Sequence, residues 1–173
     1  MLLIAEQGMS NVTISAVAER AGVSRQTVYN HFTDIDSIIL AVHERHDVMA
    51  QTGTLLGTAA TAPEKIELLI RHTIGAYTHT GSAAALVHGL GPGAQEQLRR
   101  HAAEGRDLIA SILEEGMAAK VFRDDLDPKL DARLIQGTLT AAGEAATEGK
   151  GDIPHITAAT TRSILAALAS SSA

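Results

Sequence analysis

A stretch near the N-terminus reads TISAVAERAGVSRQTVYNHF, from residue 13 to residue 32. Between Ile14 and Ala21, apolar residues recur at the i, i+3, i+4, i+7 spacing of a helix that buries one face. Thr13 stands where a hydroxyl caps a first helical turn, and Gly22 stands where helices end in a left-handed residue. The stretch therefore predicts a short helix with both of its ends marked.

A second short helix is expected directly after this glycine. Ser24 is placed to cap it, and Val28 and Phe32 supply inward apolar anchors. A supporting helix, a tight turn and a second helix with a polar outer side make a helix-turn-helix, whose second helix enters the major groove of DNA. Spacing alone is equally consistent with two ordinary amphipathic helices of a bundle. On the DNA-binding interpretation, the contacting residues are Thr13, Ser24, Arg25, Gln26, Thr27, Tyr29, Asn30 and His31.

The rest of the chain also carries the apolar spacing of helices. Strand-like alternation over four or more residues is hard to find, and aromatic residues make up only 2% of the sequence. Alanine and leucine, which favour helix, are abundant. We predict an all-α fold, with an N-terminal three-helix helix-turn-helix module followed by an antiparallel helical bundle. Beyond the first two helices, we expect others at residues 35–49, 63–77, 94–119, 128–147 and 153–169.

A change in composition suggests where the chain divides. Residues 51–62 are rich in threonine, glycine and alanine, and Pro63 then suits the first turn of a new helix. We therefore expect a DNA-binding domain at residues 1–47 and a second domain at residues 48–173.

Composition also excludes several classes of function. The 173 residues contain no cysteine, which removes disulfides, thiolate metal sites and cysteine nucleophiles. There is no phosphate-cradling glycine motif and no nucleophile elbow, so we expect neither an enzyme nor a cofactor. No leader-like segment is present, and no run approaches the roughly 20 apolar residues of a membrane span, so we expect a cytoplasmic protein. The net charge of -6 argues against a protein that coats nucleic acid, but it allows a small reading surface.

Histidines raise the question of a metal site. His43 and His46 lie one helical turn apart with Asp47 beside them, and His72 and His79 lie two turns apart. Zinc needs three or four convergent ligands with supporting groups, and neither set supplies them within one helix. We expect no metal.

Small residues recur every four positions at Gly137, Ala141 and Ala145, which would let a partner helix approach closely. The stripe could serve packing within one chain. We favour a homodimer interface that also includes Ile164 and Leu168, because two helices from each protomer make a four-helix bundle about a two-fold axis. Such a dimer would read a pseudo-palindromic operator with half-sites roughly 34 to 36 Å apart.

The helix-turn-helix resembles the N-terminal signature of the TetR family of transcriptional regulators. The resemblance lies in Ala18, Ala21-Gly22-Val23-Ser24, Thr27, Tyr29 and His31-Phe32, and the segment Phe122 to Pro128 is similar to the C-terminal pattern of many members. It implies a ligand-responsive repressor that binds double-stranded operator DNA as a homodimer and is released when a small molecule enters its C-terminal domain.

The resemblance also implies an effector cavity in that domain. We expect it to be lined by His72, Thr73, Tyr77 and His88, although these side chains could instead face solvent or fill the core.

The sequence departs from the family pattern in its N-terminal module. Only seven residues precede Gly8, so we expect either a truncated first helix or a natural start further upstream. Ile35 stands where many members carry a lysine that reaches a phosphate, and residues 1–47 hold three arginines against six acidic residues, a net charge of -3. We expect weak or strongly salt-sensitive DNA binding. The alternative function is a dimeric small-molecule-binding protein with an impaired DNA-binding head.

Overall fold

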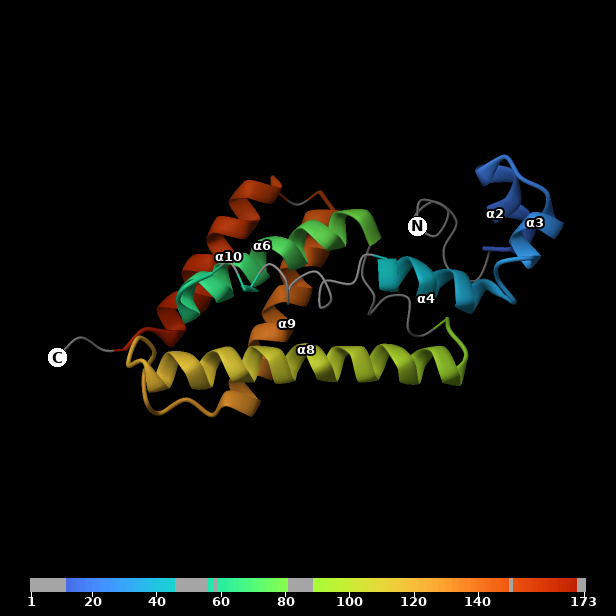
Figure 1. The fold of residues 1–173 in the computed structure, drawn as a ribbon. Coiled ribbons are helices and arrows are strands. Elements are labelled where there is room, and N and C mark those ends of the chain that lie inside the picture. Colours follow the sequence, from blue (N-terminus) through green and yellow to red (C-terminus); the bar gives the residue numbers. More distant parts are fainter. Residues whose placement is uncertain (1–11, 46–55, 58, 81–88, 150, 171–173) are drawn as a thin grey trace.

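The computed structural model describes residues 12–45, 56–57, 59–80, 89–149 and 151–170. Regular structure in these residues is helical, which confirms the all-α expectation, and their extended pairing is limited to a single bridge between Phe122 and Ala169. Figure 1 shows a small group of N-terminal helices at one end of an elongated molecule and longer helices in the rest.

The N-terminal group has the predicted local structure. Helix α2 (Ile14–Ala21) starts at Thr13, whose hydroxyl accepts the Ala16 N–H at 3.2 Å, and stops at Gly22, which has a left-handed φ of 69°. Helix α3 (Arg25–Tyr29) follows at once. The two helices pack against each other through the buried side chains of Ala18 and Val28.

Helix α4 (Ile35–Arg45) leaves this group and leads to the rest of the molecule. Asp34 begins it, because its carboxylate accepts the Ser37 N–H at 2.7 Å while the Ser37 hydroxyl donates to the Asp34 carbonyl. The helix is confirmed as far as Arg45, and its expected continuation to Met49 lies outside the described residues.

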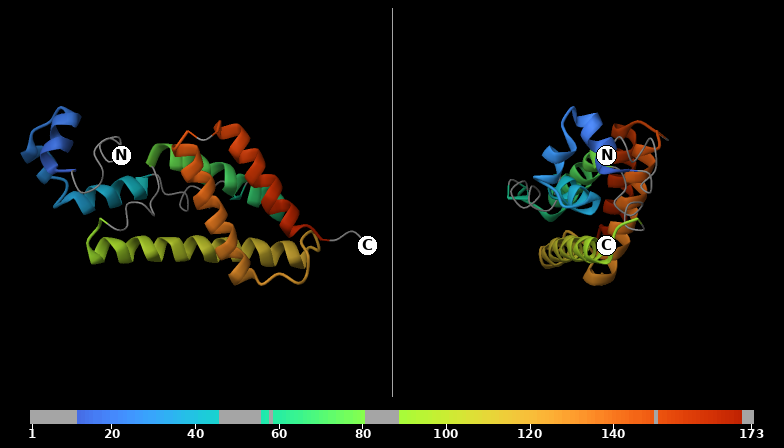
Figure 2. Two further views of the ribbon diagram at one scale, coloured as in Figure 1. Left: turned by 180° about the vertical axis from the view of Figure 1, so that it is seen from behind. Right: turned by 90° about the vertical axis from the view of Figure 1, so that its right-hand side faces the viewer.

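The remaining described helices make the C-terminal domain. They are α6 (Ala62–Thr80), α8 (Pro92–Ala118), α9 (Pro128–Thr147) and α10 (Ile153–Leu168). The two views of Figure 2 place α6, α9 and α10 together over one half of α8, while the other half of α8 lies beside α4.

The core of this domain is built around α6. Ile66, Ile70 and Ile74 recur every four residues and are fully shielded from solvent, as is Leu113 of α8. Each buried isoleucine contributes about 1.5 to 3 kcal/mol relative to exposure. The amphipathic pattern of α6 therefore places it between α8, α9 and α10.

Capping side chains set where the long helices start. The Glu64 carboxylate accepts the N–H groups of Ala60 and Thr61 at 2.9 and 3.0 Å, and these two bonds hold the pKa of Glu64 below its usual value. Asp127 and Asp152 are the N-cap residues of α9 and α10, and their carboxylates accept N–H groups of the first turn that follows.

Helix α8 differs slightly from the expectation. We predicted a start at Ala94, whereas the helix begins two residues earlier, because Pro92 occupies its first turn after Gly91.

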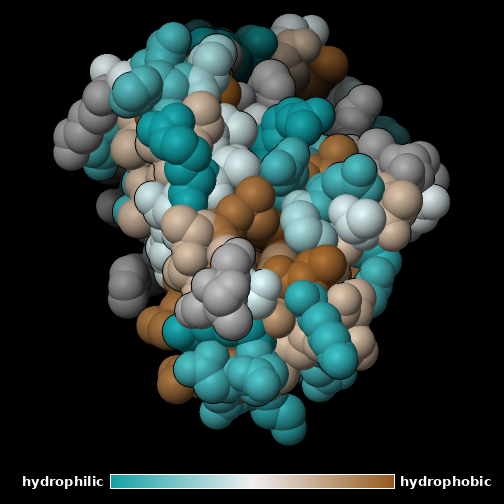
Figure 3. Space-filling model, turned by 90° about the vertical axis from the view of Figure 1, so that its left-hand side faces the viewer, coloured by the Kyte–Doolittle hydropathy of each residue, from teal (hydrophilic) through white to brown (hydrophobic). Residues whose placement is uncertain are grey.

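Figure 3 looks onto the end of the molecule that holds the C-terminal ends of α8 and α10. Apolar side chains come to the surface there in patches between hydrophilic ones. The exposed large apolar residues of the domain include Val121, Leu130, Leu134 and Ile153. Among the helices of the described ranges, none is long and apolar enough to cross a membrane.

Candidate functional site

Helix α3 presents a polar surface on a buried anchor. Val28 is only 6% exposed, whereas Tyr29 is 54% exposed. The short length of α3 follows from the tight turn at Gly22 before it and the turn that leads to α4 after it. The other predicted reading residues are also exposed: Ser24, Arg25, Gln26, Thr27, Asn30 and His31.

Hydrogen bonds hold several of these side chains in place. Gln26 donates from Nε2 to Asn30 Oδ1 at 3.0 Å, one turn along the same helix. The Ser24 hydroxyl accepts the Thr27 N–H at 3.0 Å and lies 2.9 Å from the Thr27 hydroxyl. An ordered surface of amides, hydroxyls and an arginine is chemically suited to base edges and phosphates.

Thr13 and Ser24 have a local task in addition to the predicted one. Each side-chain oxygen caps a helix by accepting a backbone N–H, Thr13 at α2 and Ser24 at α3. The two residues orient the motif whatever else they contact.

Three acidic residues at the start of α4 and along it accept hydrogen bonds. Asp34 caps α4 itself, the Asp36 carboxylate accepts the Gly91 N–H at 2.8 Å, and the Glu44 carboxylate accepts the Gln97 side-chain N–H at 2.9 Å. Two of these carboxylates therefore join α4 to α8. The sequence pattern gave no sign of these contacts, because Gly91 and Gln97 lie more than fifty residues away.

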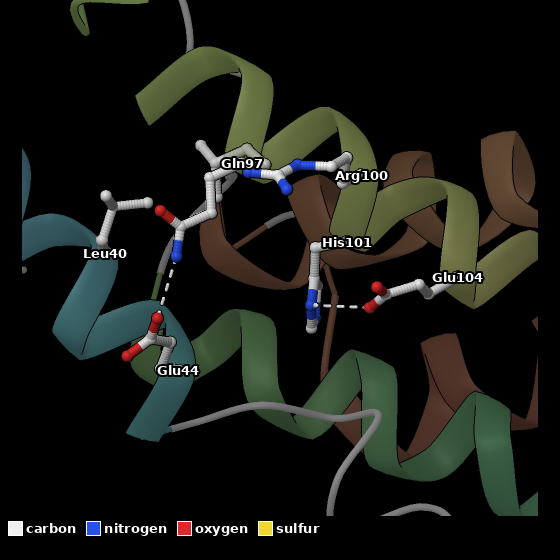
Figure 4. A pocket seen from close by; sticks show the side chains of 7 residues that line it. Leu40, Glu44, Gln97, Arg100, His101 and Glu104 are labelled. Atoms are coloured by element: carbon white, nitrogen blue, oxygen red, sulfur yellow. Dashed lines mark hydrogen bonds and ion pairs between the residues drawn. The ribbon is translucent and has the colours of Figure 1, made fainter. Parts of the chain in front are cut away.

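A groove lies between α4 and α8 (Figure 4), with a volume of about 420 Å³. Two leucines, Leu40 and Leu98, line it together with polar side chains, and His101 Nδ1 lies 3.8 Å from Glu104 Oε2. The bond between Gln97 and Glu44 crosses it. Its lining residues are Leu40, Glu44, Gln97, Leu98, Arg100, His101 and Glu104.

Tyr77 is the predicted effector residue that the structure places most clearly between helices. Its hydroxyl donates to Thr140 Oγ1 on α9 at 3.3 Å, and a Cβ added to Gly143 would overlap its ring. Burial raises the pKa of the Tyr77 phenol, the bond to Thr140 lowers it in part, and the charge of Glu144 raises it again. Tyr77 therefore joins α6 to α9 in its neutral form.

A second polar contact lies close along α9. Arg106 of α8 donates to Gln136 Oε1 at 2.9 Å, and Gln136 donates to the Ala102 carbonyl at 3.0 Å. The Thr140 hydroxyl in turn donates to the Gln136 carbonyl at 3.0 Å. These bonds continue the one between Tyr77 and Thr140, so a polar line of connected side chains runs from Tyr77 through Thr140 and Gln136 to Arg106. We had not predicted Arg106, Gln136 or Thr140.

Of the other predicted effector residues, the structure describes His72 and Thr73. His72 and Thr73 are half-buried on α6, and Thr73 lies one turn before Tyr77. His88 lies outside the described residues.

No group of three histidine, aspartate or glutamate side chains converges among the described residues. The side chains of His43, His46, Asp47 and His79 lie outside that set.

The predicted interface residues separate into two groups. Gly137 and Ala141 are exposed on α9, Ala145 is half-buried, and a Cβ on Gly137 would meet open space. Ile164 and Leu168 are 5% and 2% exposed and belong to the core of their own protomer. The side chains of Ile164 and Leu168 therefore pack within one protomer. The large apolar residues that α9 exposes are Leu130 and Leu134.

Two family models match this chain. Residues 1–42 match the model described as bacterial regulatory proteins, tetR family, and residues 59–144 match the tetracyclin repressor-like C-terminal domain. The chain belongs to the TetR family. It is a DNA-binding transcriptional regulator, as the helix-turn-helix of α2 and α3 predicted.

Known relatives of this TetR-family protein are regulators. It is 26% identical over 150 residues to the fatty acid metabolism regulator protein of Bacillus subtilis, a match that covers 79% of this chain and 74% of the relative. It is 24% identical over 147 residues to the transcriptional repressor KstR2 of Rhodococcus jostii, covering 81% and 72%. Neither relative is named as an enzyme.

The fold is shared with solved structures. The regulator FadR from Bacillus subtilis, solved in complex with stearoyl-CoA, superposes with a TM-score of 0.80 at 20% identity and covers 96% of this chain and 94% of its own. The arrangement of a small head on a helical C-terminal domain is therefore that of the family.

The neutral state of Tyr77 can be measured directly. The Tyr29→Phe variant leaves Tyr77 as the single tyrosine, and its ultraviolet titration should have a midpoint above the ordinary value of about 10. Because the pKa is raised in the folded state, the associated stability is complete below about pH 10 and is lost as pH rises through the folded-state pKa. In Tyr77→Phe this loss should be absent. A midpoint at or below the ordinary value in the folded variant would contradict the burial argument.

Proposed function

We propose that this TetR-family protein is a homodimeric repressor that leaves a pseudo-palindromic operator when a long-chain acyl-CoA thioester enters its C-terminal domain. The observation that carries the DNA-binding part is the ordered polar surface of α3, held by the buried Val28 anchor and the Gln26–Asn30 bond. We divide the chain at residue 47, with the reading head before it and the effector and dimer domain at 48–173. Because the operator is bacterial DNA, we expect the protein to act in the cytoplasm.

Roles within the reading surface follow from side-chain chemistry. Arg25 and Gln26 are proposed to contact base edges, since arginine pairs with guanine and an amide pairs with adenine. Thr27, Tyr29 and His31 are proposed to contact phosphates, which fix the register of the head on the duplex. Thr13, Ser24 and Asn30 complete the surface.

The alternative of an impaired head loses one of its supports. Asp34, Asp36 and Glu44 have structural tasks of their own, because they cap α4 or join it to α8. Ile35 is half-buried against the cluster of Ile39 and Leu90, where a lysine would bury its charge. The missing lysine is thus consistent with packing at this junction and is not by itself a sign of decay.

The proposed dimer interface is the outer face of α9. Leu130, Leu134, Gly137 and Ala141 recur along one side of this helix at helical spacing, and all four are exposed in the protomer. Exposed leucines beside small residues are typical of a surface that a partner helix covers. A two-fold axis would place this face against its own copy.

The effector class rests on the relatives and on the polar line of the C-terminal domain. One relative is a fatty acid metabolism regulator, and the Bacillus subtilis FadR structure holds stearoyl-CoA. In this chain Tyr77 and Arg106, with Thr140 and Gln136 between them, offer hydroxyl and cationic groups next to an apolar core. An acyl chain suits the apolar surroundings, and the guanidinium suits an anionic head group.

The response is proposed to pass through α4, the helix that links the head to α8. An effector that favours one arrangement of α4 over another changes the separation of the two reading heads in the dimer. Operator affinity then falls because both half-sites are no longer engaged together.

Arg25 gives the sharpest test of the reading surface. Arg25→Ala should weaken binding to the DNA beside the gene by roughly 5- to 150-fold in a mobility-shift assay, which corresponds to about 1–3 kcal/mol for one lost base contact. Discrimination against a changed guanine in the half-site should be lost at the same time. Arg99→Ala removes an exposed arginine on α8 and is the matched control. Equal effects of the two variants would contradict the proposed role, and no binding by the unmodified protein would favour the impaired-head alternative.

Stearoyl-CoA is the probe for the effector class. At saturation it should lower operator affinity by roughly 5- to 150-fold, the usual range of an allosteric coupling. Free coenzyme A should have a much smaller effect, because it lacks the apolar chain. If stearoyl-CoA binds in calorimetry but leaves operator affinity unchanged, the proposed coupling is wrong.

The dimer face is tested by adding a charge to it. Ala141→Glu should weaken the dimer by roughly 100-fold or more, because an uncompensated buried charge destabilises by about 3–5 kcal/mol. Sedimentation at micromolar concentration then reports a monomer. Ser111→Glu places the same charge on the exposed side of α8 and should remain dimeric. A dimeric Ala141→Glu protein would show that the interface lies elsewhere.

A further inference from the structure

The N-terminal ends of α4 and α8 lie together. Asp36, in the first turn of α4, contacts Gly91 at the start of α8, and Glu44 near the end of α4 contacts Gln97 further along α8. The order of these contacts means that the two helices run side by side in the same direction, as Figure 1 also shows. Parallel helices bring two positive dipole ends to one place, which is unfavourable unless a negative group lies between them.

Asp36 supplies that group. Its carboxylate is in the first turn of its own helix and accepts the Gly91 N–H at 2.8 Å. Gly91 is the N-cap position of α8 and has no side chain to cap the helix, so the carboxylate of Asp36 serves as the cap from another element. One charge therefore stabilises two helix ends, one in the reading head and one in the effector domain.

Buried apolar side chains around the bond between Asp36 and Gly91 strengthen it and restrict where the carboxylate can lie. Ile39, Leu90, Ala94 and Leu98 are each at most 7% exposed and pack beside it. Apolar neighbours reduce screening by water, so a charge-assisted hydrogen bond there is stronger than on an open surface. A Cβ on Gly91 would lie 2.9 Å from the Asp36 carboxylate oxygen, so a larger residue could not keep this approach without a shift.

We propose that Asp36 is the positioning residue that sets the angle between the DNA-reading head and α8, because its carboxylate lies in the first turn of α4 and caps the start of α8. This inference rests on the proposed function, because the head angle matters only to a protein that reads DNA. Among the described helix pairs, the principal contact of α4 outside the head is with α8. A movement of the N-terminal half of α8 would therefore reach the head through this carboxylate.

The test measures head orientation and DNA affinity separately. The chain has no cysteine, so Glu19→Cys on α2 and Glu114→Cys on α8 give two specific spin-label sites on exposed positions. Doubly labelled protein, diluted into excess unlabelled protein, reports the distance distribution within one protomer. Asp36→Ala should broaden this distribution and lower operator affinity roughly fivefold or more. Asp36→Asn keeps an acceptor oxygen and should restore part of the narrow distribution.

The matched control is Asp131→Ala. Asp131 is also a first-turn carboxylate that accepts a backbone N–H, from Asp127 at 2.9 Å, but it caps only its own helix. The Asp131→Ala variant should lower thermal stability about as much as Asp36→Ala does, without changing the distance distribution between the spin labels. Equal distributions in wild type and Asp36→Ala, or equal broadening in Asp131→Ala, would overturn the proposal. If the unmodified protein binds no operator while Asp36→Ala still broadens the distribution, the proposed function fails and the positioning role stands.

Discussion

Burial of one isoleucine column on α6 is the constraint on which the rest of the structure depends. Ile66, Ile70 and Ile74 are completely shielded, and that requires helices on several sides of α6 at once. Helices α8, α9 and α10 fill those places, and the ring of Tyr77 lies over Gly143 at the same junction with α9. Because interiors of this kind are close-packed, a shift of one helix is felt by the others.

Helix α8 is long enough to extend from this core to the reading head. A helix of 27 residues spans about 40 Å, which is longer than the core needs. Its C-terminal half contributes Ile109, Ile112 and Leu113 to the core, while its N-terminal half contributes Ala94 and Leu98 to the cluster with α4. One continuous helix therefore touches both the effector domain and the reading head, and it provides a physical path between the two.

The head itself is stabilised mainly by short-range interactions. Thr13, Gly22 and Ser24 mark helix ends, and Val28 is its buried anchor on α3. Helices α2 and α3 have little core of their own, and α4 connects them to the rest of the molecule. Three of the six acidic residues in the N-terminal module cap α4 or join it to α8.

The sequence by itself determined the helices and the reading motif, because caps and apolar spacing act within about four residues along the chain. Thr13, Ser24, Asp127 and Pro128 were readable as helix starts, and the structure confirms them.

Only the tertiary structure decided what lies across the helices. The bonds of Asp36 to Gly91 and of Tyr77 to Thr140 join residues 55 and 63 positions apart, and local periodicity carries no information on such pairs. Periodicity also marks Ile164 as apolar without saying whether its own core or a partner covers it, and the fold assigns it to the core. Helical pattern identifies a buried face, but the packing of the other helices decides what that face meets.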